Sequence, residues 1–212
     1  MQASDKSEFT LYYFKLHVRG DAMRALLHHA NASYEDKHVS FQEWKDLKPT
    51  IPSGQLPCIE FDNGKKMGES MAITRYLGMK FGYYPEDSIK AFECDMLLDM
   101  YADVVGKVYK PHFQKDEAKR DTMMPEIVEA VKKFLDRAAP HFDGHYLVGD
   151  KLSIADFWIG GLYTNYLANP EITFGKEQFA EILAAYPAFE SYGKRYADAT
   201  SSYISSRAKY PI

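Results

Sequence analysis

The stretch from Pro49 to Pro57 contains three prolines and one glycine within nine residues. Proline lacks a backbone N–H and fits neither the interior of a helix nor a central strand. The stretch therefore predicts a rigid loop. This loop constrains the fold because it separates two groups of short, regular elements in the N-terminal part of the chain.

The elements before the loop predict a β-α-β unit. Residues 9–14 form a short aromatic and β-branched run, and residues 34–39 form a second strand candidate. Between them, residues 21–32 place apolar side chains at helical spacing. Because two strands joined by a crossover helix pair in parallel, we expect a parallel pair here.

The elements after the loop predict a hairpin and a helix. Residues 57–61 and 65–67 are joined through Asn63-Gly64, and Asn-Gly readily adopts the positive φ angles of a type I′ turn. Residues 69–81 have the spacing of a helix that ends at Gly82. The predicted order is thus β-α-β, loop, β-β-α.

The rest of the chain predicts helices only. We expect them at 91–109, at 126–138 after Pro125, from the capping box Ser153-Ile154-Ala155-Asp156 to about Ala168, and at 187–199. The fold class is therefore α+β followed by α. We expect a first domain at residues 1–84 and an all-helical second domain at residues 85–212.

Composition narrows the function classes. Apolar residues make up 46% and charged residues 26%, which is ordinary for a globular protein. The net charge of −4 comes without a basic stripe, so we expect no nucleic acid partner. No run approaches a membrane span, so we expect no membrane partner. Cys58 and Cys94 show neither a disulfide framework nor zinc spacing, which favours a reducing, cytoplasmic location.

Polar residues around the loop suit a short extended peptide with a carboxylate at each end. The Trp44 indole N–H and the Lys48 ammonium can hold one carboxylate, and Ser70 at a helix N-terminus suits the other. Glu69 can pair with an amine. Each residue alone also suits an ordinary role, as a packed indole, a surface lysine or a helix cap, so their order and spacing carry the prediction.

The backbone between Gln55 and Pro57 offers a second kind of contact. If the Leu56-Pro57 peptide bond is cis, the N–H and C=O of Leu56 face an extended ligand as a strand edge does. Gln55 adds a side-chain amide. In the first strand, alternation places Tyr13 and Tyr12 on opposite faces, and both tyrosines can be core aromatics.

Four segments follow one another in a fixed order: Leu11-Tyr12-Tyr13-Phe14, Arg19-Gly20, the stretch from Trp44 to Pro57, and Glu69-Ser70-Met71-Ala72-Ile73-Thr74-Arg75-Tyr76-Leu77. They resemble the motifs of the cytosolic glutathione transferases, most closely the sigma-like class. Ser153-Ile154-Ala155-Asp156 also resembles the family's capping box. The resemblance covers nearly the whole chain. It implies a thioredoxin-like N-terminal domain, an all-helical C-terminal domain and a homodimer.

The resemblance implies a detoxification reaction in which the thiolate of glutathione, the co-substrate, attacks a hydrophobic electrophile. Tyr13 matches the family's thiol-activating tyrosine, whereas Tyr12 takes the place of a threonine. The residues expected to bind glutathione are Arg19, Trp44, Lys48, Gln55, Leu56, Pro57, Glu69, Ser70 and Asp103 of the partner subunit. The helical domain is expected to contribute the second-substrate pocket, with candidate residues Phe14, Ala102, Val105, Trp158, Leu162 and the tail near Pro211-Ile212.

Two departures from the family pattern concern the residues after Phe14. The segment between Phe14 and Arg19 is longer than the pattern by about two residues, which affects the second-substrate pocket. Asp21 stands where the sigma pattern usually supplies an arginine. A basic residue there helps a thiolate and an acid does not, so Arg19 is the candidate to compensate.

Asp95, Asp99 and Asp103 recur at every fourth residue and share one helix face. A solvated acidic stripe is the ordinary interpretation. No metal site is predicted within one chain, and a divalent ion at the dimer interface needs further oxygens from a second subunit.

Two alternative functions share most of these residues. A glutathione-dependent isomerase of the prostaglandin D synthase kind has the same peptide site and a different pocket. A non-catalytic, ligand-binding relative of the crystallin kind keeps the fold without turnover.

Overall fold

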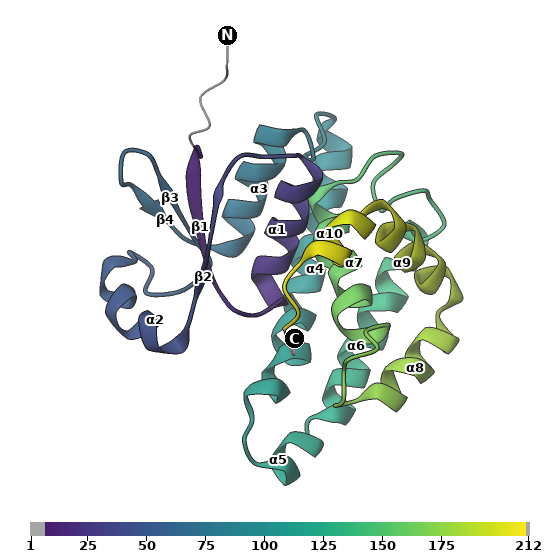
Figure 1. Cartoon of the computed structure of the whole chain (residues 1–212). Coiled ribbons are helices and arrows are strands. Elements are labelled where there is room, and N and C mark those ends of the chain that lie inside the picture. The colour runs from purple at the N-terminus through teal and green to yellow at the C-terminus, as the bar shows by residue number, and fades with distance from the viewer. Residues whose placement is uncertain (1–6, 211–212) are drawn as a thin grey trace.

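The computed structural model describes residues 7–210. Its N-terminal part is a four-stranded mixed sheet, and α1 and α3 cover the sheet face that is turned toward the helical part (Figure 1). The strand order is β2-β1-β3-β4, with β1 at Phe9–Phe14, β2 at Glu35–Val39, β3 at Cys58–Phe61 and β4 at Lys66–Met67. β1 and β2 are parallel, and the other two pairs are antiparallel. The predicted thioredoxin-like arrangement is confirmed.

The alternation predicted for β1 is also confirmed. Phe9, Leu11 and Tyr13 are buried, whereas the residues between them are half-buried. Tyr12 points to the other face, where its hydroxyl donates a hydrogen bond of 2.7 Å to Glu60. The two neighbouring tyrosines therefore have different surroundings.

The hairpin between β3 and β4 exists, but its turn is not of type I′. That turn needs a positive φ at both central residues, and of Asn63 and Gly64 only Gly64 has one, at 76°. The Gly64 N–H donates to the Phe61 carbonyl, and the Asn63 side chain accepts from the Lys65 N–H. The asparagine thus bonds to the local backbone and keeps an ordinary φ.

The N-terminal part contains one helix that the sequence analysis missed. α1 spans Val18–His29 and α3 spans Ser70–Phe81, which ends at Gly82 with a φ of 80°. Between them lies α2, Phe41–Leu47, followed by a 3-10 turn at Lys48–Thr50. Ser40 and Glu43 form a capping box at its start. Trp44 therefore lies on a helix that leads into the proline-rich loop.

The C-terminal part is helical, as predicted. Its helices are α4 (Ser88–Tyr109), α5 (Glu117–Asp121), α6 (Met124–Ala138), α7 (Ile154–Leu162), α8 (Lys176–Ala185), α9 (Pro187–Ala199) and α10 (Ser201–Ser206). A π-helical turn, Tyr163–Leu167, extends α7, and 3-10 turns occupy Lys110–Phe113 and Ala139–His141. The helices α5, α8 and α10 were not anticipated.

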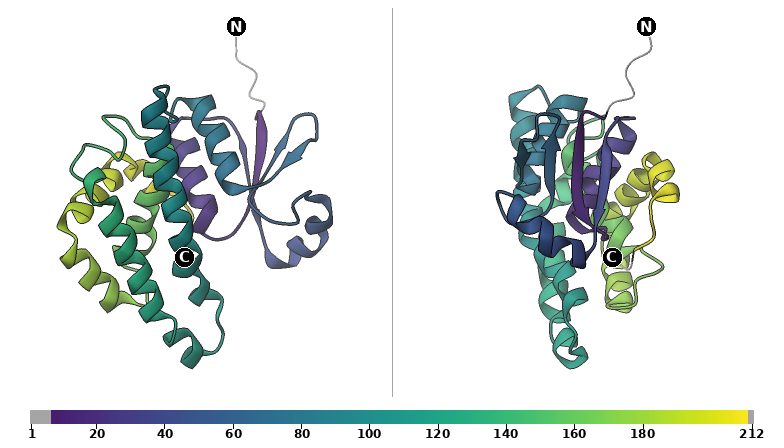
Figure 2. Two further views of the ribbon diagram at one scale, coloured as in Figure 1. Left: turned by 180° about the vertical axis from the view of Figure 1, so that it is seen from behind. Right: turned by 60° about the vertical axis from the view of Figure 1, so that its left-hand side comes forward.

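Helix α7 joins the two parts of the molecule. It packs against α4 and α9 in the helical part and against α1 of the N-terminal part (Figure 2). The predicted capping box is present: Asp156 Oδ2 accepts hydrogen bonds of 2.8 Å from both the backbone N–H and the hydroxyl of Ser153. Across the boundary, the Trp158 indole donates to the Thr74 hydroxyl of α3 at 3.0 Å. Between residues 7 and 210, no helix is long and apolar enough to cross a membrane.

Candidate functional site

A cleft of about 310 Å³ lies between the carboxyl end of β1, the α2 segment and the end of α4. Its lining residues come from three regions of the sequence: Tyr13, Phe14, Leu16, Val18 and Arg19; Phe41, Trp44, Gly54, Gln55 and Leu56; and Tyr109 and Phe113. Several predicted site residues therefore meet in one cleft.

Tyr13 is buried at the end of β1 and lines the cleft. Its hydroxyl oxygen accepts a hydrogen bond of 3.1 Å from the Arg19 backbone N–H. Burial raises the pKa of Tyr13 to about 12, although this bond and the Arg19 charge oppose the rise. The hydroxyl therefore keeps its proton at neutral pH and can act as a donor.

Gly20 explains why the Arg19-Gly20 pair follows this strand. A Cβ added at Gly20 would lie 2.2 Å from Cδ1 of Tyr13. The Tyr13 ring thus packs directly on the backbone of α1, and only glycine leaves room for it.

Arg19 spans the cleft. Its Nη1 donates to the Ser70 hydroxyl at 3.4 Å, and its guanidinium lies 5.9 Å from the centre of the Tyr109 ring. It therefore brings a positive charge between the N-terminus of α3 and the end of α4. Arg19 occupies the region where the sequence analysis expected a compensating cation.

The α2 segment and the following loop form one side of the cleft. The Trp44 ring meets Phe14 edge-on at 5.5 Å. Lys48 is exposed in the 3-10 turn after α2, where its Cε lies 3.8 Å from the ideal Cβ position of Gly54. The Leu56-Pro57 peptide bond is cis, as the sequence analysis considered.

The start of α3 lies next to Arg19 of the cleft through the Ser70 hydroxyl, but neither Glu69 nor Ser70 is among the lining residues. Ser70 is the first residue of α3 and is buried, so its hydroxyl lies beside the free N–H groups of the helix N-terminus. Glu69 precedes it with a φ of 70°, a conformation that non-glycine residues seldom adopt. Such strain is common where a backbone is held for binding.

The opposite side contains residues that the sequence analysis missed. Tyr109 and Phe113 come from the end of α4 and the turn after it, and their rings lie 6.1 Å apart. Their spacing of four residues was a readable signal of a shared helical face. Leu16 and Val18, from the lengthened segment after Phe14, also line the cleft, as does Phe41, which stacks on Phe14 at 5.1 Å.

Four of the expected second-substrate residues do not line this cleft. Val105, Trp158 and Leu162 are buried in the packing of α4 and α7. Ala102 is exposed on α4, and of the expected residues within 7–210 only Phe14 reaches the cleft. Pro211 and Ile212 lie outside the described residues. Asp103 is also exposed on α4 and lies in a groove between α4 and α6.

Two family models match the chain: the glutathione S-transferase N-terminal domain over residues 7–79 and the glutathione S-transferase C-terminal domain over residues 97–198. The chain is 33% identical over 189 residues to glutathione S-transferase 4 of Caenorhabditis elegans, covering 82% of this chain and 87% of that protein. The chain belongs to the glutathione S-transferase family. The expectation that it is an enzyme of this family is thereby confirmed.

Solved structures of transferase relatives share the fold. The structure of prostaglandin synthase D of Nilaparvata lugens superposes with a TM-score of 0.77 at 25% identity, covering 95% of this chain and 99% of the other. A monomeric glutathione S-transferase of Necator americanus, Na-GST-3, gives a TM-score of 0.83 at 23% identity, with 97% and 100% covered. The second likeness shows the fold alone.

Asp21 of this transferase is turned away from the cleft. It is buried, and its carboxylate accepts hydrogen bonds from His17, Asn165, Tyr203 and Arg207. Burial alone raises the pKa of Asp21, but the His17 bond, the Arg207 charge and the Tyr203 bond hold it below its usual value. Asp21 is therefore a charged structural centre rather than a neighbour of the thiol.

The acidic face of α4 is paired with a cation. Arg75 of α3 bonds to Asp95 at 2.7 Å and lies 3.7 Å from Asp99. In the part of the chain that the structure describes, no three His, Cys, Asp or Glu side chains gather in a way that could hold a metal ion.

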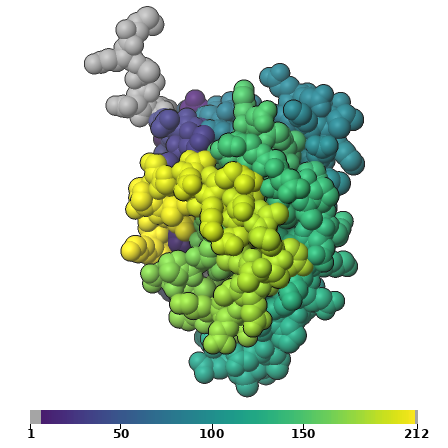
Figure 3. Space-filling view, turned by 90° about the vertical axis from the view of Figure 1, so that its right-hand side faces the viewer, coloured from purple at the N-terminus to yellow at the C-terminus, as the bar shows by residue number. Residues whose placement is uncertain are grey.

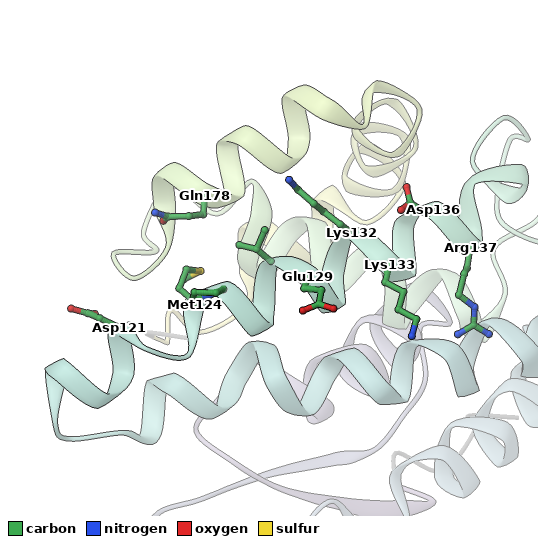
Figure 4. Close-up of a pocket in the computed structure, with 10 residues that line it drawn as sticks. Asp121, Met124, Glu129, Lys132, Lys133, Asp136, Arg137 and Gln178 are labelled. Atoms are coloured by element: carbon green, nitrogen blue, oxygen red, sulfur yellow. The ribbon is translucent and has the colours of Figure 1, made fainter.

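A groove larger than the cleft lies elsewhere on the transferase. It measures about 890 Å³ and runs between α6 and the start of α8 (Figure 4). Met124 and Val128 give it an apolar floor, and Figure 4 shows Lys132 extending toward α8 while Lys133 and Arg137 point to the opposite side of α6. None of its lining residues is a tyrosine that could donate to a thiolate, so the smaller cleft is the candidate site.

Proposed function

We propose that this enzyme conjugates the thiolate of glutathione to hydrophobic electrophiles and that the Tyr13 hydroxyl activates the thiol. The observation that carries the proposal is the environment of that hydroxyl. Its oxygen already accepts from the Arg19 N–H, and the raised pKa of Tyr13 keeps its proton in place. Among the described residues no group accepts that proton, so it remains available for a sulfur in the cleft.

The energy required for thiol activation is modest. A cysteine-type thiol has a pKa of about 8.5, and lowering it by two units takes about 2.7 kcal/mol. A hydrogen bond to a charged group contributes about 1.5–3 kcal/mol. The Arg19 guanidinium and the N-terminus of α3 add positive potential on the same side. These groups together are sufficient for a thiolate at neutral pH.

Glutathione extends along the side of the cleft formed by α2, the loop and α3. In this arrangement Trp44 and Lys48 hold one carboxylate, and Ser70 with the N–H groups of α3 holds the other. Gln55 and the backbone of Leu56, before Pro57, bind the extended peptide, and Glu69 pairs with the amine. Arg19 supports the sulfur end.

The electrophile occupies the aromatic side of the cleft. Phe14, Tyr109 and Phe113 offer ring faces there, and Phe113 is 48% exposed. An exposed aromatic side chain at the mouth of a cleft favours an apolar second substrate. This assignment keeps Phe14 and otherwise replaces Ala102, Val105, Trp158 and Leu162, which were expected from sequence, by residues at the end of α4.

The enzyme forms a homodimer through the outer face of α3 and α4. Met79, Ile89 and Phe92 on this face are 63%, 66% and 67% exposed. Asp103 lies further along α4. In the dimer, Asp103 of the partner subunit meets the glutathione amine. Sedimentation of Phe92→Glu tests the dimer: we expect a monomer with weaker glutathione binding, and an unchanged dimer contradicts this face as the interface.

Further parts of the proposal are a sigma-like class, a role in detoxification and a cytoplasmic location. Both cysteines are free and buried, which fits a reducing compartment.

The decisive experiment combines glutathione-affinity capture with a chlorodinitrobenzene conjugation assay. We expect the wild type to bind and turn over. Tyr13→Phe should bind but lose about 100-fold in kcat. Tyr12→Phe is the matched control and should keep full activity, because its hydroxyl bonds to Glu60 on the other sheet face. Binding without turnover by the wild type contradicts the transferase and favours a ligand-binding protein.

A second candidate is a glutathione-dependent isomerase. It is favoured by the structural likeness to prostaglandin synthase D of Nilaparvata lugens at 25% identity. An isomerase returns glutathione unchanged, whereas a transferase consumes it. Measuring glutathione consumption against product formed with a prostaglandin endoperoxide therefore separates the two functions.

A further inference from the structure

The two departures from the family pattern, the lengthened segment Lys15–Val18 and Asp21, are in direct contact. His17 of the segment is buried, and its Nδ1 lies 3.0 Å from Oδ1 of Asp21. Because a carboxylate only accepts, His17 Nδ1 carries the proton of this bond. On either side of His17, Leu16 and Val18 line the cleft.

Asp21 is bonded to residues from the far end of the chain. Arg207 Nη1 donates at 2.8 Å and the Tyr203 hydroxyl donates at 2.6 Å. Asn165, in the π-helical turn after α7, donates at 2.9 Å and also accepts from Arg207. The C-terminal segment Arg207–Tyr210 is thereby fixed against α1. Figure 3 shows the C-terminal residues, in yellow, on the surface beside N-terminal residues in purple.

Tyr210 lies between two histidines of the N-terminal part. Its backbone N–H donates to His17 Nε2 at 3.3 Å, and its hydroxyl lies 2.7 Å from His38 Nδ1. Its ring centre is 5.3 Å from that of His17 and 5.8 Å from that of His38. One C-terminal residue thus contacts both the lengthened segment and strand β2.

Both histidines can make these contacts only in the neutral form. His17 donates through Nδ1 and accepts through Nε2, so a second proton removes the acceptor that Tyr210 uses. His38 Nε2 lies 3.0 Å from Asp36, and its Nδ1 faces Nη2 of Arg24 at 3.2 Å. An arginine only donates, so His38 Nδ1 is the acceptor for both Arg24 and the Tyr210 hydroxyl.

Arg24 connects these contacts to the backbone of the lengthened segment and to Tyr13. Its Nη1 donates to the Leu16 carbonyl at 3.1 Å, and its Nε bonds to Asp36 at 2.9 Å. Its guanidinium also lies 5.7 Å from the centre of the Tyr13 ring. Tyr210, through His17 and His38, is therefore coupled to the backbone of the segment that lines the cleft.

We propose that Tyr210 is a positioning residue for the second-substrate side of the cleft: it holds Lys15–Val18 in place through two neutral histidines, and acid releases the segment. The kinetic consequence rests on the proposed transferase function. The structural consequence is that opening of the segment depends on Tyr210 and on pH, and it does not rest on that function.

The groups that face the two histidines define the pH response. His17 faces the Asp21 carboxylate from α1 and, beyond it, the Arg207 guanidinium. His38 faces Asp36 of β2, Arg24 of α1 and Lys15 of the segment. Burial and the Arg24 and Lys15 charges lower the pKa of His38, and Asp36 opposes them. The segment should therefore be held at neutral pH and loosen as pH falls below the ordinary histidine range of about 6.5.

Hydrogen exchange of a peptide spanning residues 14–20 tests the structural part without any substrate. At neutral pH, Tyr210→Phe loses the hydroxyl, and Tyr210→Pro loses both the hydroxyl and the N–H. We expect protection of this peptide to fall about fivefold for the first and further for the second. Tyr186→Phe, which removes a hydroxyl that bonds to Asp136, is the control and should leave the peptide unchanged. Unchanged protection in Tyr210→Pro overturns the proposal.

The pH dependence is tested with His38→Gln. Glutamine keeps one donor and one acceptor but does not titrate near neutrality. After correction for the intrinsic exchange rate, protection in the wild type should fall between about pH 7 and pH 5, and His38→Gln should flatten that change. A wild type without pH dependence, or a variant with the same dependence, overturns the acid release.

Steady-state kinetics tests the positioning role. Tyr210→Pro should raise the KM for the electrophile about fivefold, while the KM for glutathione stays within about twofold. Equal changes in both, or none, overturn the positioning role even if exchange responds. Absence of turnover in the wild type instead contradicts the proposed function and leaves the exchange result standing.

Discussion

The proposed glutathione side and the proposed second-substrate side of the cleft, named below the glutathione side and the second-substrate side, differ in how far apart in the chain their residues lie. On the glutathione side, Trp44, Lys48, the cis Leu56-Pro57 bond and Ser70 come from neighbouring segments of one small domain. The other side combines Leu16 and Val18 with Tyr109 and Phe113 of the helical part. Its supporting contacts reach Arg207 and Tyr210.

The two sides also use different chemistry. The glutathione side uses a helix N-terminus, backbone groups and fixed charges, which suit one defined peptide. The second-substrate side uses ring faces and apolar side chains held by distant contacts, which suit substrates of varied shape. The second-substrate side can therefore change its substrate without disturbing the glutathione side. Substitutions should accordingly separate the two sides.

The largest effect is expected from Gly20→Ala, where the glycine packs against the Tyr13 ring. The added Cβ would meet the Tyr13 ring at 2.2 Å, so the ring or α1 must move. We expect a loss of about 100-fold in kcat, as for removal of a catalytic donor. Overpacking should also cost about 1–3 kcal/mol in the free energy of unfolding. Denaturant unfolding and conjugation assays measure both, and unchanged activity contradicts the packing described for Tyr13.

The second-largest effect is expected on the stability of the second-substrate side at low pH. His112, next to Phe113, is half-buried, and its Nε2 has no partner among residues 7–210. Burial, with the Arg120 charge, lowers the pKa of His112 to about 4. As pH falls, the unfolded chain therefore binds this proton at a higher pH than the folded chain does. The contribution of His112 to the free energy of unfolding is complete above about pH 6.5 and is lost as pH falls toward 4.

The free energy of unfolding should fall by about 2 kcal/mol as His112 is protonated. This is less than the full pKa shift of His112 implies, because the ring is partly open to water. His112→Phe keeps the aromatic contacts to Tyr166 and Phe174 without titrating. The difference in unfolding free energy between wild type and variant should therefore change with pH. A constant difference from pH 7 to pH 4 contradicts the prediction.

The third effect tests the charge on the glutathione side. Lys48→Ala should raise the KM for glutathione about tenfold, because a charge-assisted bond to a carboxylate is lost. The KM for the electrophile should stay unchanged. Lys45→Ala, an exposed lysine on the same segment, is the control, and an equal effect in both variants indicates general electrostatics instead of a bound carboxylate.

The smallest effect is expected from Phe113→Ala on the second-substrate side. Losing one partly exposed ring should raise the KM for apolar electrophiles about threefold to fivefold, through the apolar contact area removed. The KM for glutathione should not change. A comparable rise in the KM for both substrates contradicts the conclusion that the two sides bind different substrates.

The sequence predicted those parts of the fold whose cause is local. Alternation in β1, the stop at Gly82 and the capping box at Ser153 and Asp156 each act over a few residues, and all three are confirmed. The start of α2 also has a local signal, since Ser40 and Glu43 form its capping box. This helix was not predicted because it leads directly into the proline-rich loop.

The parts that could not be predicted depend on contacts between distant residues. Asp21 meets Arg207 across 186 positions and Asn165 across 144, and no short pattern encodes such pairs. Trp158 and Leu162 were expected in the pocket, but packing between α7 and its neighbours buries them. Tyr109 and Phe113 reach the cleft instead because α4 continues into a 3-10 turn that carries them there.

The proposed stabilisation of the glutathione thiolate by Tyr13 is tested most directly by titrating bound glutathione and following its thiolate absorbance in the ultraviolet. In the wild type and in Tyr12→Phe, the thiol of bound glutathione should ionise well below the free value of about 8.5. In Tyr13→Phe, with glutathione still bound, its pKa should return close to that value. An equally low thiol pKa in Tyr13→Phe contradicts the proposed role of the Tyr13 hydroxyl.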